Sequence, residues 1–169
     1  MREIKDKYWL ALGLYTYAHD LHFRGNYSQA RVVGEEALVL IREVGEPHAH
    51  VLILSALGYF AYAQGDLAMA TQRYEQTLQI AKVTKNQPLI ASCLVAQGAI
   101  AARLGQARQA ARLWGAADGT ALTLDLGNHN WYADIVRTQL GEEAFAAAWA
   151  EGQAMALEQI LVPQELRET

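Results

Sequence analysis

The sequence predicts an all-helical protein, a right-handed α-solenoid of three helix hairpins closed by a C-terminal helical cap. Three observations predict it: a repeat of 40 residues, a glycine at the same place in each repeat, and apolar segments of helical length. The stretches 24–30, 64–70 and 104–110 align without gaps. In all three the second residue is glycine and the last is alanine: Gly25, Gly65 and Gly105, then Ala30, Ala70 and Ala110. Units of this size that recur in register are typical of solenoids, in which each unit packs against its neighbours.

Each predicted repeat consists of two helices joined at the glycine. The first helix is apolar on nearly every side and ends where a residue with positive φ can close a helix. The residue after the glycine is Asn26 or Asp66, both strong N-caps, or Gln106, a weaker one. The second helix is amphipathic and exposes one face to water. Pro47 and Pro88 fall near the first turn of the following helix, where proline is favoured.

We expect a single domain over residues 1–169. The predicted repeats cover 8–46, 47–86 and 87–127, and the cap covers 128–162. A fourth copy would place glycine at position 145, but Phe145 stands there. Helices are instead expected at 131–140 and 142–151, after a stop at 127–130. The last helix carries an apolar stripe that we expect to cover the third repeat: Ala144, Phe145, Ala148 and Trp149.

The composition narrows the function classes. Of the 169 residues, 52% are hydrophobic and 19% are charged, which is typical of a folded domain. The formal net charge of −4 argues against direct binding to nucleic acid. The single cysteine, Cys93, excludes an intramolecular disulfide and a metal site built from cysteines. We expect Cys93 to be a packed thiol. We also expect no cofactor.

The sequence also predicts a cytoplasmic protein without membrane contact. The N-terminal stretch has no small-residue cleavage site, so it does not read as a signal peptide. Residues 47–65 contain no Asp, Glu, Lys or Arg, and this run has nearly the length of ~20 residues that a membrane span needs. However, this run contains His48, His50, Ser55 and Gln64, and we interpret it as a buried helix.

In its repeats the sequence resembles the tetratricopeptide repeat (TPR) family. The family's Leu-Gly pair is matched by Leu57-Gly58 and, less closely, by Gln97-Gly98 and Tyr17-Ala18. The small residue after the turn is the alanine of each aligned stretch. The aromatic residue four positions later is Tyr74 or Trp114, but Gly34 in the first repeat. The family's 34-residue period is stretched here to 40, as in the long variant of bacterial signalling ATPases.

The last third is similar to the C-terminal TPR sensor region of bacterial signalling ATPases and LuxR-type transcriptional regulators. The likeness lies in 111–127 and in 140–161, and the part from Gly141 to Gly152 matches the ending of those regulators. It implies a role in bacterial signal transduction or transcriptional regulation. The regulators' nucleotide-binding module has no counterpart here, because the chain lacks a G-x-x-x-x-G-K-[ST] motif, and no DNA-binding helix pair is recognisable.

The resemblance also implies a binding face on the first helix of each repeat. The chemically informative positions of that face are Tyr15, His19, His22, Ser55, Tyr59, Tyr62 and Arg103. Tyrosine and histidine suit recognition because they are rigid, largely apolar and polar at the tip. The alternative is that the tyrosines only pack on the next helix. His19 and His22 supply two nitrogens without a third ligand nearby in sequence, so a metal site is not expected.

These features together predict a non-enzymatic module that binds a protein, a peptide or a small effector. The alternative is a structural module that self-associates into a homodimer through an end of the solenoid, because the apolar first helix has no capping helix before it. Arg103, Arg108 and Arg112 form a local basic cluster, which is either a solvated face or a docking patch for an acidic protein. No G-x-S-x-G or H-E-x-x-H motif is present, so we do not expect an enzyme.

Overall fold

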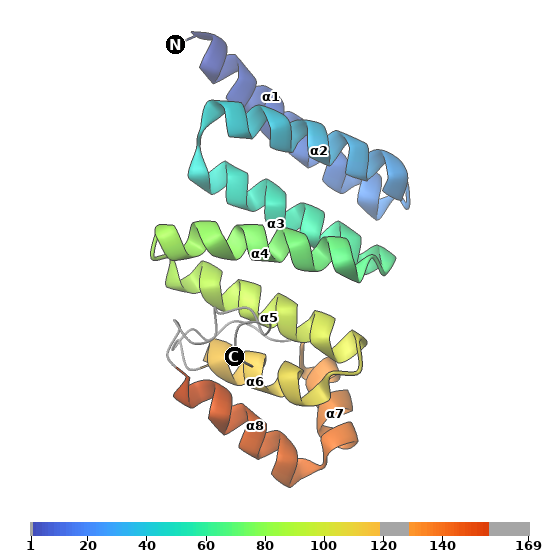
Figure 1. Cartoon of the computed structure of the whole chain (residues 1–169). Helices are drawn as coiled ribbons and strands as arrows, with labels where there is room; N and C mark the ends of the chain where they lie inside the picture. The colour runs from blue at the N-terminus through green and yellow to red at the C-terminus, as the bar shows by residue number, and fades with distance from the viewer. Residues whose placement is uncertain (1, 119–128, 156–169) are drawn as a thin grey trace. The chain divides into compact units, whose positions relative to one another are not determined.

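A computed structural model describes residues 2–118 and 129–155 of the protein (Figure 1). All regular structure within these ranges is helical, which confirms the all-α prediction. The chain divides into two compact units, with the boundary between Val83 and Thr84. The first unit contains α1 (Arg2–Phe23), α2 (Tyr27–Val44), α3 (Pro47–Gln64) and α4 (Leu67–Val83). The second contains α5 (Gln87–Arg103), α6 (Ala107–Asp118), α7 (His129–Leu140) and α8 (Glu142–Ala154).

The turns inside the helix pairs lie where the sequence predicts them. Gly25, Gly65 and Gly105 have φ angles of 80°, 83° and 75°, in the left-handed region that favours glycine. Gly45 repeats this geometry at the end of α2, with a φ of 74°, and only Glu46 separates it from α3. The right-handed stacking of the hairpins into one solenoid remains a prediction.

The helix caps differ in part from the sequence expectation. Asp66 does cap α4, because its Oδ1 accepts a hydrogen bond from Met69 N at 3.1 Å. Asn26 makes no side-chain cap bond. Its ψ of 57° departs from the extended backbone typical of a capping residue, so that expectation is wrong. Two unpredicted caps occur: the Glu46 carboxylate accepts from His48 N and Ala49 N, and Asn86 Oδ1 accepts from Leu89 N.

In both units, a glycine of one helix lies against an aromatic side chain of the next helix. In the first unit, a methyl group placed on Gly58 would lie 3.1 Å from the Tyr74 ring of α4. In the second unit, a methyl group on Gly98 would lie 2.6 Å from Cδ1 of Trp114, whose Nε1 also donates to Val95 O at 3.2 Å. These contacts bring helix backbones close together.

The first predicted repeat lacks the aromatic residue of this pairing and compensates locally. Gly34 of α2 faces Ala18 of α1, and the end of the Leu57 side chain from α3 fills the remaining space. Leu57 is buried together with Ile41 of α2 and Ile53 of α3 in the core of the first unit. An aliphatic side chain from the next helix therefore takes the place of the missing ring.

In the second unit, α8 packs on α6 as expected for a covering helix, but through a shifted stripe. Phe145 and Ala148 are buried, whereas Ala144 is exposed, so the prediction for Ala144 is wrong. The contact stripe continues instead to Gly152, one turn further along α8. Of the predicted stop at 127–130, positions 127 and 128 lie outside the described residues, and α7 already begins at His129, so the helix starts earlier than predicted. Within the described ranges, the structure contains no helix with the length and apolarity that a membrane crossing requires.

Candidate functional site

Aromatic and imidazole rings from three helices gather in the first unit. We call this group the aromatic–imidazole cluster, and its members are Tyr15, His19, His22, Phe23, Tyr27, Tyr59 and Phe60. Tyr15, His19 and His22 lie at i, i+4 and i+7 of α1, so they share one helix face. Tyr27 begins α2 directly after the Gly25 turn, and α3 supplies Tyr59 and Phe60.

His22 is the centre of the cluster. Its imidazole stacks on the ring of Phe60, with 4.5 Å between centroids and 16° between planes. The rings of Tyr27 and Tyr59 lie 5.2 Å and 5.5 Å away. Only 6% of His22 is exposed, and its Nδ1 has no hydrogen-bond partner among the described residues. His22 therefore lies beneath the surface that was predicted from its register, and it supports the surrounding rings.

The outer part of the cluster is exposed and apolar. Phe23 is 73% exposed, Tyr27 46% and Tyr59 43%, whereas Phe60 beneath them is 2% exposed. His19 is half-buried and packs edge-on against Phe60 and Tyr15, at 5.0 Å and 4.8 Å. Exposed aromatic side chains held on a buried aromatic base form a preorganised apolar surface, because little side-chain entropy remains to be lost on binding.

The electrostatics of the cluster favour neutral imidazoles. Burial lowers the pKa of His19, and burial together with the charge of His19 lowers the pKa of His22. The charged groups of this helix end, Asp20 and Arg24, pair with each other at 2.8 Å. The cluster itself contains no carboxylate and no lysine or arginine side chain, so it suits a neutral or apolar ligand group.

Acidification is therefore expected to weaken the first unit. The unfolded chain binds protons near the ordinary histidine pKa of 6.5, and the folded chain binds them only at lower pH. The free energy of unfolding, measured by urea titration, should fall as pH decreases from 7 through this window. The stabilising cap of Glu46, whose pKa lies below 4.5, is lost only in more acidic solution.

Two variants test whether His22 contributes to this pH dependence of the free energy of unfolding. His22→Phe should reduce this slope, because the ring stacking is kept and one titrating imidazole is removed, while His19 and His50 still contribute. His48→Gln, at an exposed position, should leave it unchanged. A slope that is equally steep in His22→Phe and in the parent would contradict the assignment.

The other predicted site residues lie apart from the cluster or at its side. Ser55 and Tyr62 are half-buried on the same face of α3 as Tyr59. Arg103 is exposed at the end of α5 and belongs to the second unit. The structure thus brings together Tyr15, His19, His22 and Tyr59 of the predicted set.

Three members of the cluster are missing from the predicted site set. Tyr27 belongs to a second helix, and helical register on the first helices does not reveal it. Phe23 carries no polar group, whereas every residue of the predicted set does. Phe60 is the buried base. The signal for Tyr27 was its position two residues after Gly25, because a tight turn returns it to the end of α1.

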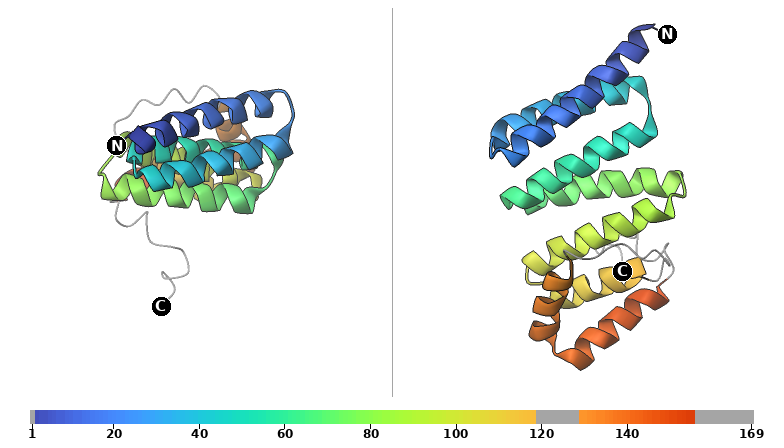
Figure 2. Two further views of the ribbon diagram at one scale, coloured as in Figure 1. Left: turned by 90° about the horizontal axis from the view of Figure 1, so that it is seen from above. Right: turned by 180° about the vertical axis from the view of Figure 1, so that it is seen from behind.

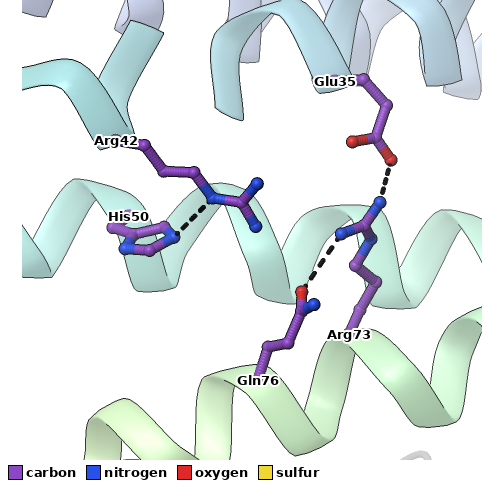
Figure 3. A network of polar contacts seen from close by, with 5 residues as sticks. All are labelled: Glu35, Arg42, His50, Arg73 and Gln76. Carbon is purple, nitrogen blue, oxygen red and sulfur yellow. Dashed lines mark hydrogen bonds and ion pairs between the residues drawn. The ribbon is translucent and has the colours of Figure 1, made fainter. Parts of the chain in front are cut away.

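A polar network holds α4 against α2 on another side of the first unit (Figure 3). The Arg73 guanidinium pairs with Glu35 and donates to Gln76 Oε1 at 3.1 Å, and its side chain is only 11% exposed. Nearby, Arg42 Nε donates to His50 Nε2 at 3.4 Å. Burial and the charge of Arg42 lower the pKa of His50. Every polar partner in this network is another side chain of the same unit, which is typical of a structural role.

The basic cluster of the second unit is partly neutralised. Arg108 and Arg112 both pair with Glu151 of α8, so they help to hold α8 on α6.

Burial raises the pKa of the Cys93 thiol to about 12, which keeps it protonated at neutral pH. Within 2–118 and 129–155 no group of three or more His, Cys, Asp or Glu side chains is arranged to hold a metal ion.

Comparison with known proteins adds no family assignment. A scan against protein-family models gives no match for this chain, and a search of curated proteins gives none either.

Proposed function

We propose that this protein is a non-enzymatic binding module that docks a segment of another protein on the aromatic–imidazole cluster. The observation that carries the proposal is the exposure of Phe23, Tyr27 and Tyr59 around a packed His22–Phe60 base. Rings of this kind supply much of the binding energy in protein interfaces, because they bury a large apolar area from a fixed position. The resemblance to TPR sensor regions supports the same reading and suggests a role in bacterial signal transduction or transcriptional regulation.

The chemistry of the cluster specifies the kind of segment. Its rings are neutral, and Asp20 and Arg24 neutralise each other beside it. A strongly charged peptide would lose hydration there without gaining a counter-ion. We therefore expect a neutral segment with aliphatic or aromatic side chains, whose polar groups meet the tyrosine hydroxyls.

A displayed library of random peptides tests this proposal. Selection on the full chain should enrich neutral sequences with aromatic or aliphatic residues. In titrations with a selected peptide, Phe23→Ala combined with Tyr59→Ala should weaken binding by about tenfold or more, as for central interface residues. Circular dichroism should show an unchanged fold, because both side chains are exposed.

Two exposed valines of the same unit supply the matched control. Val32 and Val39 of α2 are 65% and 54% exposed and make no part of the cluster. Val32→Gln with Val39→Gln should leave the affinity unchanged. Equal affinity of the parent and the Phe23/Tyr59 variant would show that the binding site lies elsewhere. A loss of binding in the valine control would move the site to α2.

A further inference from the structure

One face of α1 is exposed where its counterpart on α3 is buried. In the 40-residue register, Trp9, Gly13, Tyr17 and Asp20 correspond to Ala49, Ile53, Leu57 and Phe60. The four residues of α3 are at most 4% exposed and belong to the core that α3 forms with α2. Their counterparts on α1 are exposed, including Trp9 at 60% and Tyr17 at 48%. We call this face, together with Leu10 and Thr16, the α1 stripe.

Gly13 stands at the middle of the α1 stripe and has no partner in the described part of the chain. A methyl group placed there would find no atom within 4 Å. Each of the other helical glycines in 2–118 and 129–155 lies against a side chain or backbone of a second helix. A glycine inside a helix costs about 1 kcal/mol relative to alanine, so a close contact usually accounts for it. At Gly13 that contact has to come from outside this unit.

The path of α1 differs from that of α3 at the start of the helix. Gly45 and Glu46 form the short link that lets α2 fold back onto α3. The corresponding register positions are Lys5 and Asp6, and α1 is continuously helical there. Its first turns extend past the end of α2 (Figure 2). A preceding helix linked as α2 is linked to α3 would need a turn at residues 5–6.

The order of residues in the stripe is self-complementary. Trp9 and Tyr17 lie four residues before and four after Gly13, and Leu10 and Thr16 lie three before and three after. If two copies of α1 cross antiparallel at Gly13, each tryptophan meets the tyrosine of the other copy, and each leucine meets a threonine. Close helix contacts at a glycine already occur inside the chain, since the rings of Tyr74 and Trp114 lie on Gly58 and Gly98.

We propose that the protein forms a two-fold symmetric homodimer in which the α1 stripes of two copies pack antiparallel and cross at Gly13. At the ends of the contact, Asp6 of one copy comes beside the Asp20–Arg24 ion pair of the other, and Arg24 is within reach of both carboxylates. Such an interface is isologous, so the same patch serves both copies. The α1 stripe adjoins the aromatic–imidazole cluster at the end of α1, because Phe23 lies three residues after Asp20 and seven after Thr16.

Sedimentation velocity over a micromolar concentration series tests the dimer. We expect a concentration-dependent dimer in the parent, and an association at least about tenfold weaker in Trp9→Ala and in Tyr17→Ala. Gly13→Ala should have opposite effects on two quantities: a higher melting temperature of the dilute monomer, because alanine favours the helix, and weaker dimerisation, because a Cβ separates the helices. Val32→Gln with Val39→Gln should leave dimerisation unchanged, because neither valine belongs to the α1 stripe. Glutamine suits these positions, since α4 carries Gln72 and Gln79 at the matching register positions.

Cysteine pairs determine the direction of the helices. Under oxidation, Gly13→Cys should form a disulfide-linked dimer, whereas the parent, with its buried Cys93, should not. Trp9→Cys alone should not cross-link, because the two introduced thiols lie about 12 Å apart along an antiparallel pair, beyond disulfide reach. A mixture of Trp9→Cys and Tyr17→Cys should cross-link as a heterodimer. A monomer at every concentration, a dimer unaffected by Trp9→Ala and Tyr17→Ala, or efficient cross-linking of Trp9→Cys alone would overturn the proposal.

Discussion

Gly152→Ala is expected to release α8 from α6 and to lower the free energy of unfolding of the second unit by about 3 kcal/mol or more. A methyl group at Gly152 would overlap the Arg112 carbonyl oxygen and would lie 2.8 Å from Ala116 N. Gly115 makes the reciprocal contact with the backbone of Trp149. Backbone atoms inside a helix cannot rotate away as a side chain can, so the two helices have to separate.

Denaturant unfolding followed by tryptophan fluorescence measures this effect, because Trp114 and Trp149 lie in the affected unit. Gly115→Ala should give a loss of similar size. Gly13→Ala in dilute protein is the matched control, since the same substitution in open space should stabilise the helix by about 1 kcal/mol. A Gly152→Ala protein as stable as the parent would contradict the interlocked contact of α6 and α8.

The glycine–aromatic contacts predict a graded series of stabilities. Gly98→Ala should be strongly destabilising, by about 2–3 kcal/mol, because the added methyl group would overlap the Trp114 ring, which its hydrogen bond to Val95 O holds in place. Gly58→Ala should cost less, because Tyr74 lies 3.1 Å away and needs to move only slightly. Gly34→Ala should be nearly neutral, because its neighbour is the flexible end of the Leu57 side chain.

Thermal unfolding of the three variants under one set of conditions checks this order. Combining Gly98→Ala with Trp114→Leu separates steric overlap from helix propensity. If overlap is the cause, Gly98→Ala should cost less in the Trp114→Leu background than in the parent. A constant cost in both backgrounds would point to an effect on the helix alone.

The helices were largely predictable because their signals are local. Apolar segments of sufficient length, left-handed glycines and prolines in first turns act within a few residues of one another. The caps were less predictable. Asn26 is a common N-cap residue type but makes no cap bond, whereas the Glu46 carboxylate does cap a helix. Cap formation depends on the backbone angles of the preceding turn, and residue type alone does not determine them. The exposed Ala144 has a similar cause, since the rotation of α8 about its axis is set by the close contact at Gly152.

The candidate site was predictable only within single helices. The spacing of Tyr15, His19 and His22 places them on one face of α1, and Tyr59 occupies the matching position on α3. The contact of His22 with Tyr27 depends on how the turn at Gly25 returns the chain, and the stacking on Phe60 depends on how α3 packs on α1. Burial of His22 likewise follows from three helices together, so no pattern along one helix could show it.

The contact between α6 and α8 has a consequence for the order in which the chain folds. Arg108 and Glu151, which pair across this contact, are 43 residues apart in sequence, and the whole of α7 lies between them. The helix pairs of the first unit, in contrast, close through turns of a few residues, which is fast because little loop entropy is lost. During synthesis, the α6 surface at Gly115 leaves the ribosome well before the helix that covers it. This stretch of apolar surface is therefore uncovered while the chain is growing, and the contact of α6 with α8 forms only when α8 has been made.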